Sequence, residues 1–331
     1  MSFRAKRRIC MHKLLNILLS SLALSGLIFI GLPHFPAHFA GYFIFLTLLA
    51  TPFVVLLVLV EIALLLWTKS RWRWFMAVII IGCLGVLQNH WIRPHSSPPA
   101  AHSLRVLSWN VTNFHIHQDT LQKAATFIRT LQPDIICLQE RPHENLIAWE
   151  TIQAAFPEYK YTLRNEERED EVLNLAILSK YPLSESEETY YTDTYNKSMA
   201  ANVSAPSRKF RLHNAHLQTT QHVFTRFIEN AQRRNAQADQ LKTEIQASGI
   251  PTLVCGDFND TPCSYTYRKL CFGMQDAFLK GSEQWTGSFQ PMGRWLRIDY
   301  IHCSPDWQVQ AYQLIENPWS DHKMQLATLN Y

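Results

Sequence analysis

The sequence predicts an α/β sandwich of two sheets with outer helices, preceded by three membrane-spanning helices. Three observations lead to this prediction. Long apolar runs are confined to the first 92 residues, and each is long enough to span a bilayer. From residue 104 onward, short β-rich runs are separated by turns and amphipathic stretches. Strands and helices are mixed rather than strictly alternating, which favours two packed sheets over one parallel sheet.

Each apolar run of the N-terminal part approaches the ~20 residues that a helix needs to cross a bilayer. The runs occupy residues 14–32, 41–67 and 74–92, and their only acid is Glu61. A helical hairpin buried in a soluble domain is the alternative, but helices of soluble domains have a polar face, which these runs almost entirely lack. A cleaved signal peptide is an alternative for the first run only. Because two more runs follow it, we interpret it as an anchor.

Basic residues flank these runs unevenly. Lys and Arg cluster before the first run and between the second and third, whereas the loop between the first two, residues 33–40, has none. The positive-inside rule then places the N-terminus in the cytoplasm and, after three crossings, the rest in a periplasmic or extracellular space. We therefore expect a multi-pass integral membrane protein with an anchor over residues 1–92, a Pro/Ser-rich linker over 93–103 and one globular domain over 104–331.

The charge of the globular part differs from that of the whole chain, which has a net charge of +4. Residues 101–331 hold 22 basic and 26 acidic residues, a net charge of −4. This part therefore lacks the bulk positive charge that binds nucleic acid by counterion release, which argues against long duplex DNA without excluding nucleic acid. Whether Cys263 and Cys271 form a disulfide depends on the redox compartment, and the sequence leaves that open.

Apolar patterns in the globular domain predict strands over 104–111, 133–140, 174–183, 209–218, 252–260 and 297–305, and a last strand near the C-terminus. Two helices are expected, an amphipathic one over 120–132 and a long polar one over about 222–248. The polar segments 165–170 and 184–195 are interpreted as loops.

Polar residues gather at the ends of these predicted strands. A charged group at a buried strand end needs a partner, and any one of these residues alone would be interpreted as a hydrogen-bonded turn residue. Together they predict a shared cleft. They are Asn110, Glu140, His216, Asp257, Asn259, Asp299, Asp321 and His322.

The chemistry of such a set is specific. Carboxylate and amide oxygens suit Mg²⁺, or Mn²⁺, rather than zinc. A bound cation of this kind polarises a phosphoryl oxygen. A neutral histidine can accept a proton from water near pH 7, and an amide can donate to a phosphoryl oxygen. The set therefore predicts metal-assisted chemistry on a phosphate ester.

Six motifs in order, SWNV, LQE, HL, GDFN, RIDYI and SDH, resemble those of the endonuclease/exonuclease/phosphatase superfamily, to which deoxyribonuclease I belongs. The resemblance covers residues 104–331. Together with the predicted anchor over residues 1–92, the chain resembles a membrane-anchored member of this superfamily. It implies a four-layer α/β sandwich and hydrolysis of phosphodiester or phosphomonoester bonds by metal-assisted attack of water, without a covalent intermediate.

The resemblance also implies roles on the metal side of the site. Glu140 is expected to be the principal Mg²⁺ ligand, with Asn110 beside it and Asp321 on the same side. Asp257 and Asn259 are expected to position the attacking water and to contact the phosphate.

The remaining roles concern the phosphate and the substrate. His322 resembles the catalytic histidine, which Asp299 would orient, and His216 matches the histidine that contacts the phosphate or the leaving group. Trp285 and Phe289 fall where relatives place substrate-contacting aromatic residues.

Two features of the sequence receive no role in the predicted site. The segment KMQL after SDH stands where many relatives have a proline and an apolar residue. Arg233, Arg234 and Gln237 lie on the predicted long helix, and we interpret them as surface or packing residues of that helix.

The substrate stays open because one fold serves many functions. The prediction is a membrane-tethered nuclease acting on DNA or RNA. The alternative is a phosphodiesterase or phosphatase for lipid headgroups or small esters, which the tether and the net charge of −4 favour. A catalytically inactive membrane sensor or scaffold is the third interpretation. The expected partners are the phosphate-ester substrate and the lipid bilayer, with no obligate protein partner.

Overall fold

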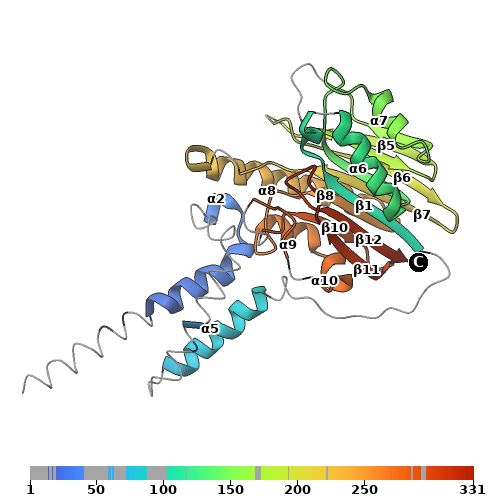
Figure 1. Ribbon diagram of the computed structural model, residues 1–331. Helices are drawn as coiled ribbons and strands as arrows, with labels where there is room; N and C mark the ends of the chain where they lie inside the picture. The colour runs from blue at the N-terminus through green and yellow to red at the C-terminus, as the bar shows by residue number, and fades with distance from the viewer. Residues whose placement is uncertain are drawn as a thin grey trace, which may run out of the picture.

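The computed structural model (Figure 1) describes most of the globular domain and parts of the N-terminal region. The described residues are 14, 17, 20–40, 59, 60, 62, 72–87, 103–116, 118–167, 173–192, 194–220, 223–284, 286–291 and 296–331. The predicted linker, 93–103, lies outside them except for Ser103. The division of the chain at these boundaries therefore stays a prediction.

The prediction of three membrane-spanning helices, and with it a multi-pass membrane location, is contradicted. Among the described residues, no helix combines the length and the apolar character needed to cross a bilayer. Helix α5, Trp72–Leu87, has 16 residues and so covers about 24 Å, less than the ~30 Å of a hydrocarbon core. The second predicted span, 41–67, lies outside the described residues apart from 59, 60 and 62.

Part of the apolar surface of the described N-terminal helices packs between helices, whereas Leu24, Leu27, Val78 and Ile81 are exposed. The helix that includes residues 20–31 lies beside α5 in Figure 1, and the Cys83 thiol lies 4.0 Å from the Gly26 carbonyl oxygen. The buried side chains of these helices include Ala23, Phe29, Ile79, Ile80 and Cys83. The short element η1 (Leu32–His34) then packs on helix α9 (Tyr265–Cys271) of the globular domain, and α2 (Ala37–Ala40) packs on helix α8 (Val223–Ala247).

Two six-stranded sheets form the centre of the globular domain. The first has the order β11-β12-β1-β2-β4-β3 and the second β5-β6-β7-β8-β10-β9. The strands of the first sheet are β1 Ser103–Asn110, β2 Ile135–Arg141, β3 Tyr161–Arg164, β4 Asn174–Ser179, β11 Gln308–Ile315 and β12 Met324–Asn330. Those of the second are β5 Leu183–Tyr190, β6 Lys197–Ala205, β7 Arg208–His216, β8 Thr252–Asp257, β9 Gln275–Asp276 and β10 Asp299–Cys303.

Each sheet contains one parallel pair at its centre, while its other pairs are antiparallel. Helix α6 (Gln118–Leu131) connects β1 to β2, and helix α8 (Val223–Ala247) connects β7 to β8. Because paired parallel strands end at the same edge of a sheet, the two pairs direct four strand ends toward one region.

Helices cover the outer face of each sheet (Figure 1). Apolar residues of α6 and α7 (Trp149–Ala155) pack with those of β1, β2 and β4 in one cluster. Apolar residues of α8 and α9 (Tyr265–Cys271) pack with those of β7, β8 and β10 in another. A third cluster fills the space between the sheets and includes α10 (Ala277–Gly281). The predicted two-sheet α/β sandwich is therefore confirmed.

The predicted loop over 184–195 is wrong, because most of it forms β5. The side chains of β5 are largely exposed since this strand is an edge of its sheet, so its sequence shows no apolar alternation. Arg211 of β7 partly fixes the strand by donating to the Glu187 carboxylate at 2.7 Å. Exposed charges on an edge strand also oppose pairing with other chains.

Gly256 in β8 is required by the packing of β7 against β8. Its φ is +147°, and a Cβ there would collide with the Ala215 carbonyl oxygen. We expect Gly256→Ala to lower the free energy of unfolding by about 2–4 kcal/mol, from overlap and backbone strain together. Gly249→Ala is the control, because Gly249 has φ +64° but open space around it, and should cost about 1 kcal/mol. Equal losses in urea unfolding would contradict this account.

Candidate active site

The candidate site lies where the parallel strand pairs of the two sheets end. Asn110 ends β1, and Glu140 lies one residue before the end of β2. In the second sheet, His216 ends β7 directly opposite Asp257, the last residue of β8. Asp299 begins β10 and pairs with Asp257 in antiparallel register. The two sheets thus supply groups to a common region.

Asn110 bridges carboxylates from the two sheets. Its amide nitrogen lies 3.0 Å from Glu140 Oε1 and 3.0 Å from Asp257 Oδ2, and its side chain is fully buried. Its amide oxygen accepts from the Thr112 backbone N–H at 3.0 Å. The structure therefore turns the donor end of Asn110 toward the carboxylates, and this contact lowers the repulsion between them.

Glu140 has a left-handed backbone, with φ +51°. It sits at an irregularity of β2, where the pairing with β4 shifts between Leu138 and Arg141. Asn259 is also left-handed, with φ +52°. This conformation costs roughly 1–2 kcal/mol for a residue other than glycine and persists where surrounding contacts impose it, commonly at functional sites.

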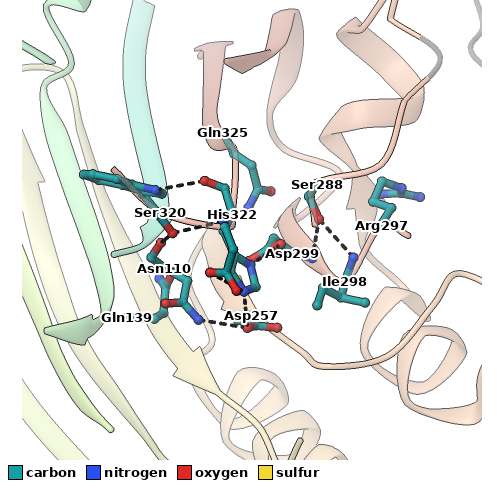
Figure 2. Close-up of polar contacts among 12 residues, drawn as sticks. Asn110, Gln139, Asp257, Ser288, Arg297, Ile298, Asp299, Ser320, His322 and Gln325 are labelled. Carbon is teal, nitrogen blue, oxygen red and sulfur yellow. Dashed lines mark hydrogen bonds and ion pairs between the residues drawn. The ribbon is translucent and has the colours of Figure 1, made fainter. Parts of the chain in front are cut away.

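His322 lies beside Asp299 and Asp257 at the centre of Figure 2. Its Nδ1 is 3.0 Å from both carboxylate oxygens of Asp299, and its Nε2 is 3.7 Å from Asp257 Oδ2 and 3.9 Å from Asp321 Oδ1. Burial alone would lower the pKa of His322, but Asp299 and Asp257 together raise it well above its ordinary value. Near neutral pH this imidazole is therefore charged.

Asp257 is almost fully buried beside Asp299. Burial and the neighbouring Asp299 charge raise its pKa, against the hydrogen bonds that it accepts. One of these bonds comes from the Asn259 backbone N–H, at 2.8 Å from Asp257 Oδ1. Without a bound cation, the cluster thus favours an extra proton on this carboxyl group.

His216 has the opposite character. Burial lowers its pKa despite the nearby Glu140 carboxylate, whose Oε1 lies 3.5 Å from His216 Nε2. The same Nε2 is 3.1 Å from the Asn259 amide nitrogen. Lys197, opposite His216 in the β6–β7 register, is almost fully buried and lowers the pKa of His216 further. At neutral pH, His216 is therefore uncharged.

Asp321 lies at the edge of the cluster and is partly exposed. It accepts from the Thr112 hydroxyl at 2.6 Å, and that hydroxyl lies 2.9 Å from Ser320 Oγ. Ser320 Oγ in turn accepts from the His322 backbone N–H and donates to the Asn110 carbonyl oxygen. Ser320 thus ties the turn that bears His322 to the end of β1.

Several supporting residues were missed from the sequence. Trp109 Nε1 and the Asn317 amide both donate to the His322 carbonyl oxygen, at 3.2 and 2.9 Å. Ser288 Oγ accepts from the backbone N–H of Asp299 at 3.1 Å. Ser320 and Trp109 stood inside the recognised motifs SDH and SWNV, but nothing in the sequence marked Asn317 or Ser288.

The aromatic residues predicted to contact substrate have different outcomes. The Phe289 ring lies 5.0 Å from the His322 ring, and its backbone pairs with that of His322. Phe289 is therefore at the site, and its contact with substrate stays a prediction. Trp285 lies outside the described residues.

The polar residues predicted from the strand ends thus come together in one cluster. Two sets of three among the described residues have donor atoms within 4.8 Å of one another: Glu140, His216 and Asp257, and Asp257, Asp299 and His322. Cys263 and Cys271, whose pairing the sequence left open, do not form a disulfide.

The model of the Endonuclease/Exonuclease/phosphatase family matches residues 107–322. This match spans well over half of the chain, so the chain belongs to that family, and membership indicates a phosphoester hydrolase. No curated protein matches the chain.

Solved structures show the same fold at low identity. A family member from Bacteroides thetaiotaomicron is 17% identical, with TM-score 0.57, over 69% of this chain and 95% of the other. A humanised D. rerio TDP2 is 19% identical, with TM-score 0.58, over 69% and 99%. A mannosyl-6-phosphatase from B. thetaiotaomicron is 15% identical, with TM-score 0.55, over 69% and 100%. At these identities the likeness concerns the fold alone.

The contact between Asp299 and His322 gives the first prediction for the site. We expect Asp299→Asn to lower kcat on bis-p-nitrophenyl phosphate by roughly 10²- to 10⁴-fold, because the histidine loses the group that orients it. The same change should lower the pKa of His322, since a carboxylate that stabilises the imidazolium is removed.

NMR titration of the histidine rings in metal-free protein measures the second effect. Asp306→Asn is the control, because Asp306 is exposed and its carboxylate accepts only a local hydrogen bond from Ser304. A His322 midpoint that is the same in Asp299→Asn and in the wild type would contradict the assignment.

Proposed function

We propose that the chain is a divalent-metal-dependent phosphoester hydrolase, with Mg²⁺ as the ordinary cofactor and Mn²⁺ as a substitute. The observation that carries the proposal is the convergence of Glu140, Asp257 and Asp299 with two histidines of opposite charge state. Hydrolysis of a phosphate ester needs a proton acceptor for water and positive groups around the phosphoryl oxygens, and this cluster supplies both.

The donor set fits a hard cation. Glu140 offers a partly exposed carboxylate, and Asp257 offers a buried one within reach of it. Oxygen ligands of this kind suit Mg²⁺ or Mn²⁺, which retain several waters and bind few protein groups. Asp321 completes the metal side in this proposal, and the Asn110 amide nitrogen holds the Glu140 and Asp257 carboxylates in place. When bound, the cation would polarise a phosphoryl oxygen and offset developing charge.

The two histidines have different tasks. Charged His322, oriented by Asp299, donates a hydrogen bond to a phosphoryl oxygen. Neutral His216 and the amide of Asn259 contact another oxygen of the phosphate or the leaving group. The Asp257 carboxylate, which accepts from the Asn259 backbone N–H and the Asn110 amide, positions the attacking water and accepts its proton.

The leading candidate substrate is a nucleic acid strand, so the proposed activity is that of a nuclease. A small phosphate ester is the second candidate, favoured by the net charge of −4 over residues 101–331. One solved structure with the same fold is named a mannosyl-6-phosphatase, so a protein named for a small phosphate ester has this fold.

Hydrolysis by the purified full chain tests the proposal. The panel contains single- and double-stranded DNA, RNA, mannose 6-phosphate and bis-p-nitrophenyl phosphate, each with Mg²⁺ and with EDTA. Cleavage of DNA or RNA with Mg²⁺ supports the nuclease, and turnover of small esters alone supports the second candidate. Turnover of none, or turnover unaffected by EDTA, would refute the proposal.

Glu140→Gln tests the metal side of the site. We expect Mg²⁺ to raise the Tm of the wild type, because a ligand that binds only the folded state stabilises it. Glu140→Gln should weaken metal affinity by roughly 100-fold or more and lose this shift. Glu150→Gln, an exposed acid on α7, is the control and should keep it. An equal Mg²⁺-induced shift in Tm for Glu140→Gln and the wild type would refute the assignment of Glu140.

A further inference from the structure

Two buried side chains of helix α8 reach the loops that carry His216 and Asn259. Arg234 is 1% exposed and Gln237 is 3% exposed, although both lie on a helix with many polar residues. Their neighbour Arg233 is partly exposed and pairs with Glu229 one turn away, at 2.6 Å. Of the two interpretations from the sequence, surface or packing, burial favours packing for Arg234 and Gln237, and their polar atoms also contact the loops of the site.

Arg234 joins two segments of the site. Its Nε lies 3.0 Å from Asp260 Oδ2, in the turn that follows Asp257. Its Nη1 donates to the Gln218 carbonyl oxygen at 2.9 Å, in the segment that follows His216. One guanidinium group thus connects the end of β7 to the end of β8.

Gln237 completes the hold on the first of these segments. Its Oε1 accepts from the Gln218 backbone N–H at 2.7 Å. Both backbone polar groups of Gln218 are therefore bound by side chains of α8. The Gln237 amide nitrogen also donates to Thr194 Oγ1 at 3.3 Å, which connects the helix to the loop before β6.

These contacts fix the spacing between His216 and Asn259. The Asn259 amide nitrogen donates to the Leu217 carbonyl oxygen at 2.9 Å and lies 3.1 Å from His216 Nε2. Leu217 stands between His216 and the residue that α8 holds, while Asp260 directly follows Asn259. Tyr300 holds the other side of the turn by donating to the Asp260 carbonyl oxygen at 2.8 Å.

We propose that Arg234 and Gln237 are positioning residues for phosphoester hydrolysis. They hold the segments on either side so that the His216 ring and the Asn259 amide face the same oxygen of the substrate. Neither residue touches the reacting atoms. The inference rests on the proposed function, since it concerns the groups that contact the phosphate in that function.

A merely structural role would have a different signature. Removal of one partner of a buried ion pair leaves the other charge unpaired and destabilises the fold, so a merely structural role would act through the folded fraction of the protein. A positioning role instead lowers kcat in fully folded protein, because small displacements of a reacting geometry are costly. The substrate's ground-state binding, and hence KM, should change much less.

The test compares Arg234→Met and Gln237→Leu with Arg233→Met in the full-length protein. The substrate is the best one of the panel, at saturating Mg²⁺ and at a temperature where circular dichroism shows each variant folded. We expect kcat to fall by about 10- to 100-fold in Arg234→Met and in Gln237→Leu, with KM within about threefold of the wild type. Arg233→Met should match the wild type.

Gln237→Glu separates positioning from simple loss of packing. It keeps the oxygen that accepts from the Gln218 N–H, so it should recover most of the kcat lost in Gln237→Leu. If Arg234→Met does not fold, the two Gln237 variants decide the question alone.

Two results would overturn the inference. In the first, the wild type is active, and folded Gln237→Leu has the same kcat as the folded control Arg233→Met. In the second, Gln237→Glu is as slow as Gln237→Leu. If the wild type turns over no ester, the proposed function is refuted, and this inference with it. That result differs from the first two, in which the wild type is active.

Discussion

The candidate site depends on the burial of negative charge at the junction of two sheets. Asp257 and Asp299 are almost fully buried, and Glu140 and Asp321 lie beside them. Carboxylates removed from water need partners, or they take up protons. In the protein alone, the Asn110 amide and the charged His322 provide part of this compensation, and the raised pKa of Asp257 shows that it is incomplete. In the proposed function, a bound divalent cation would supply the rest of the compensation.

The fold makes this arrangement possible through its two parallel strand pairs. β1 and β2 bring Asn110 and Glu140 to one edge, and β7 and β8 bring His216 and Asp257 to the facing edge. The backbone is strained at two positions of the site, Glu140 and Asn259, which have left-handed conformations. Contacts from outside the cluster hold these positions, and the side chains of α8 extend that support to the helical layer.

Much of the site could be predicted from the sequence because its groups sit at strand ends inside ordered motifs. The elements that carry no such signal were missed. The edge strand β5 is polar because water covers it, so it was predicted as a loop.

Arg233 and Arg234 are adjacent and chemically identical, and only packing shows that one is exposed and the other buried. The apolar N-terminal runs lack a polar face, but no described helix there is long and apolar enough to span a bilayer, and part of their apolar surface is buried in packing against each other. Asn110 was predicted as a metal ligand, yet its oxygen is used by Thr112, which only the local turn geometry reveals.

The proposed function requires that a cation bind beside the buried Asp257 carboxyl group and displace the proton that its raised pKa favours in the metal-free protein. Calorimetric titration of Mn²⁺ into the full chain at pH 7, repeated in buffers with different ionisation enthalpies, measures the protons released on binding. The account predicts saturable binding with release of roughly one proton per ion, because the cation replaces protons held by the cluster. Absence of saturable binding, or binding without proton release, would contradict it.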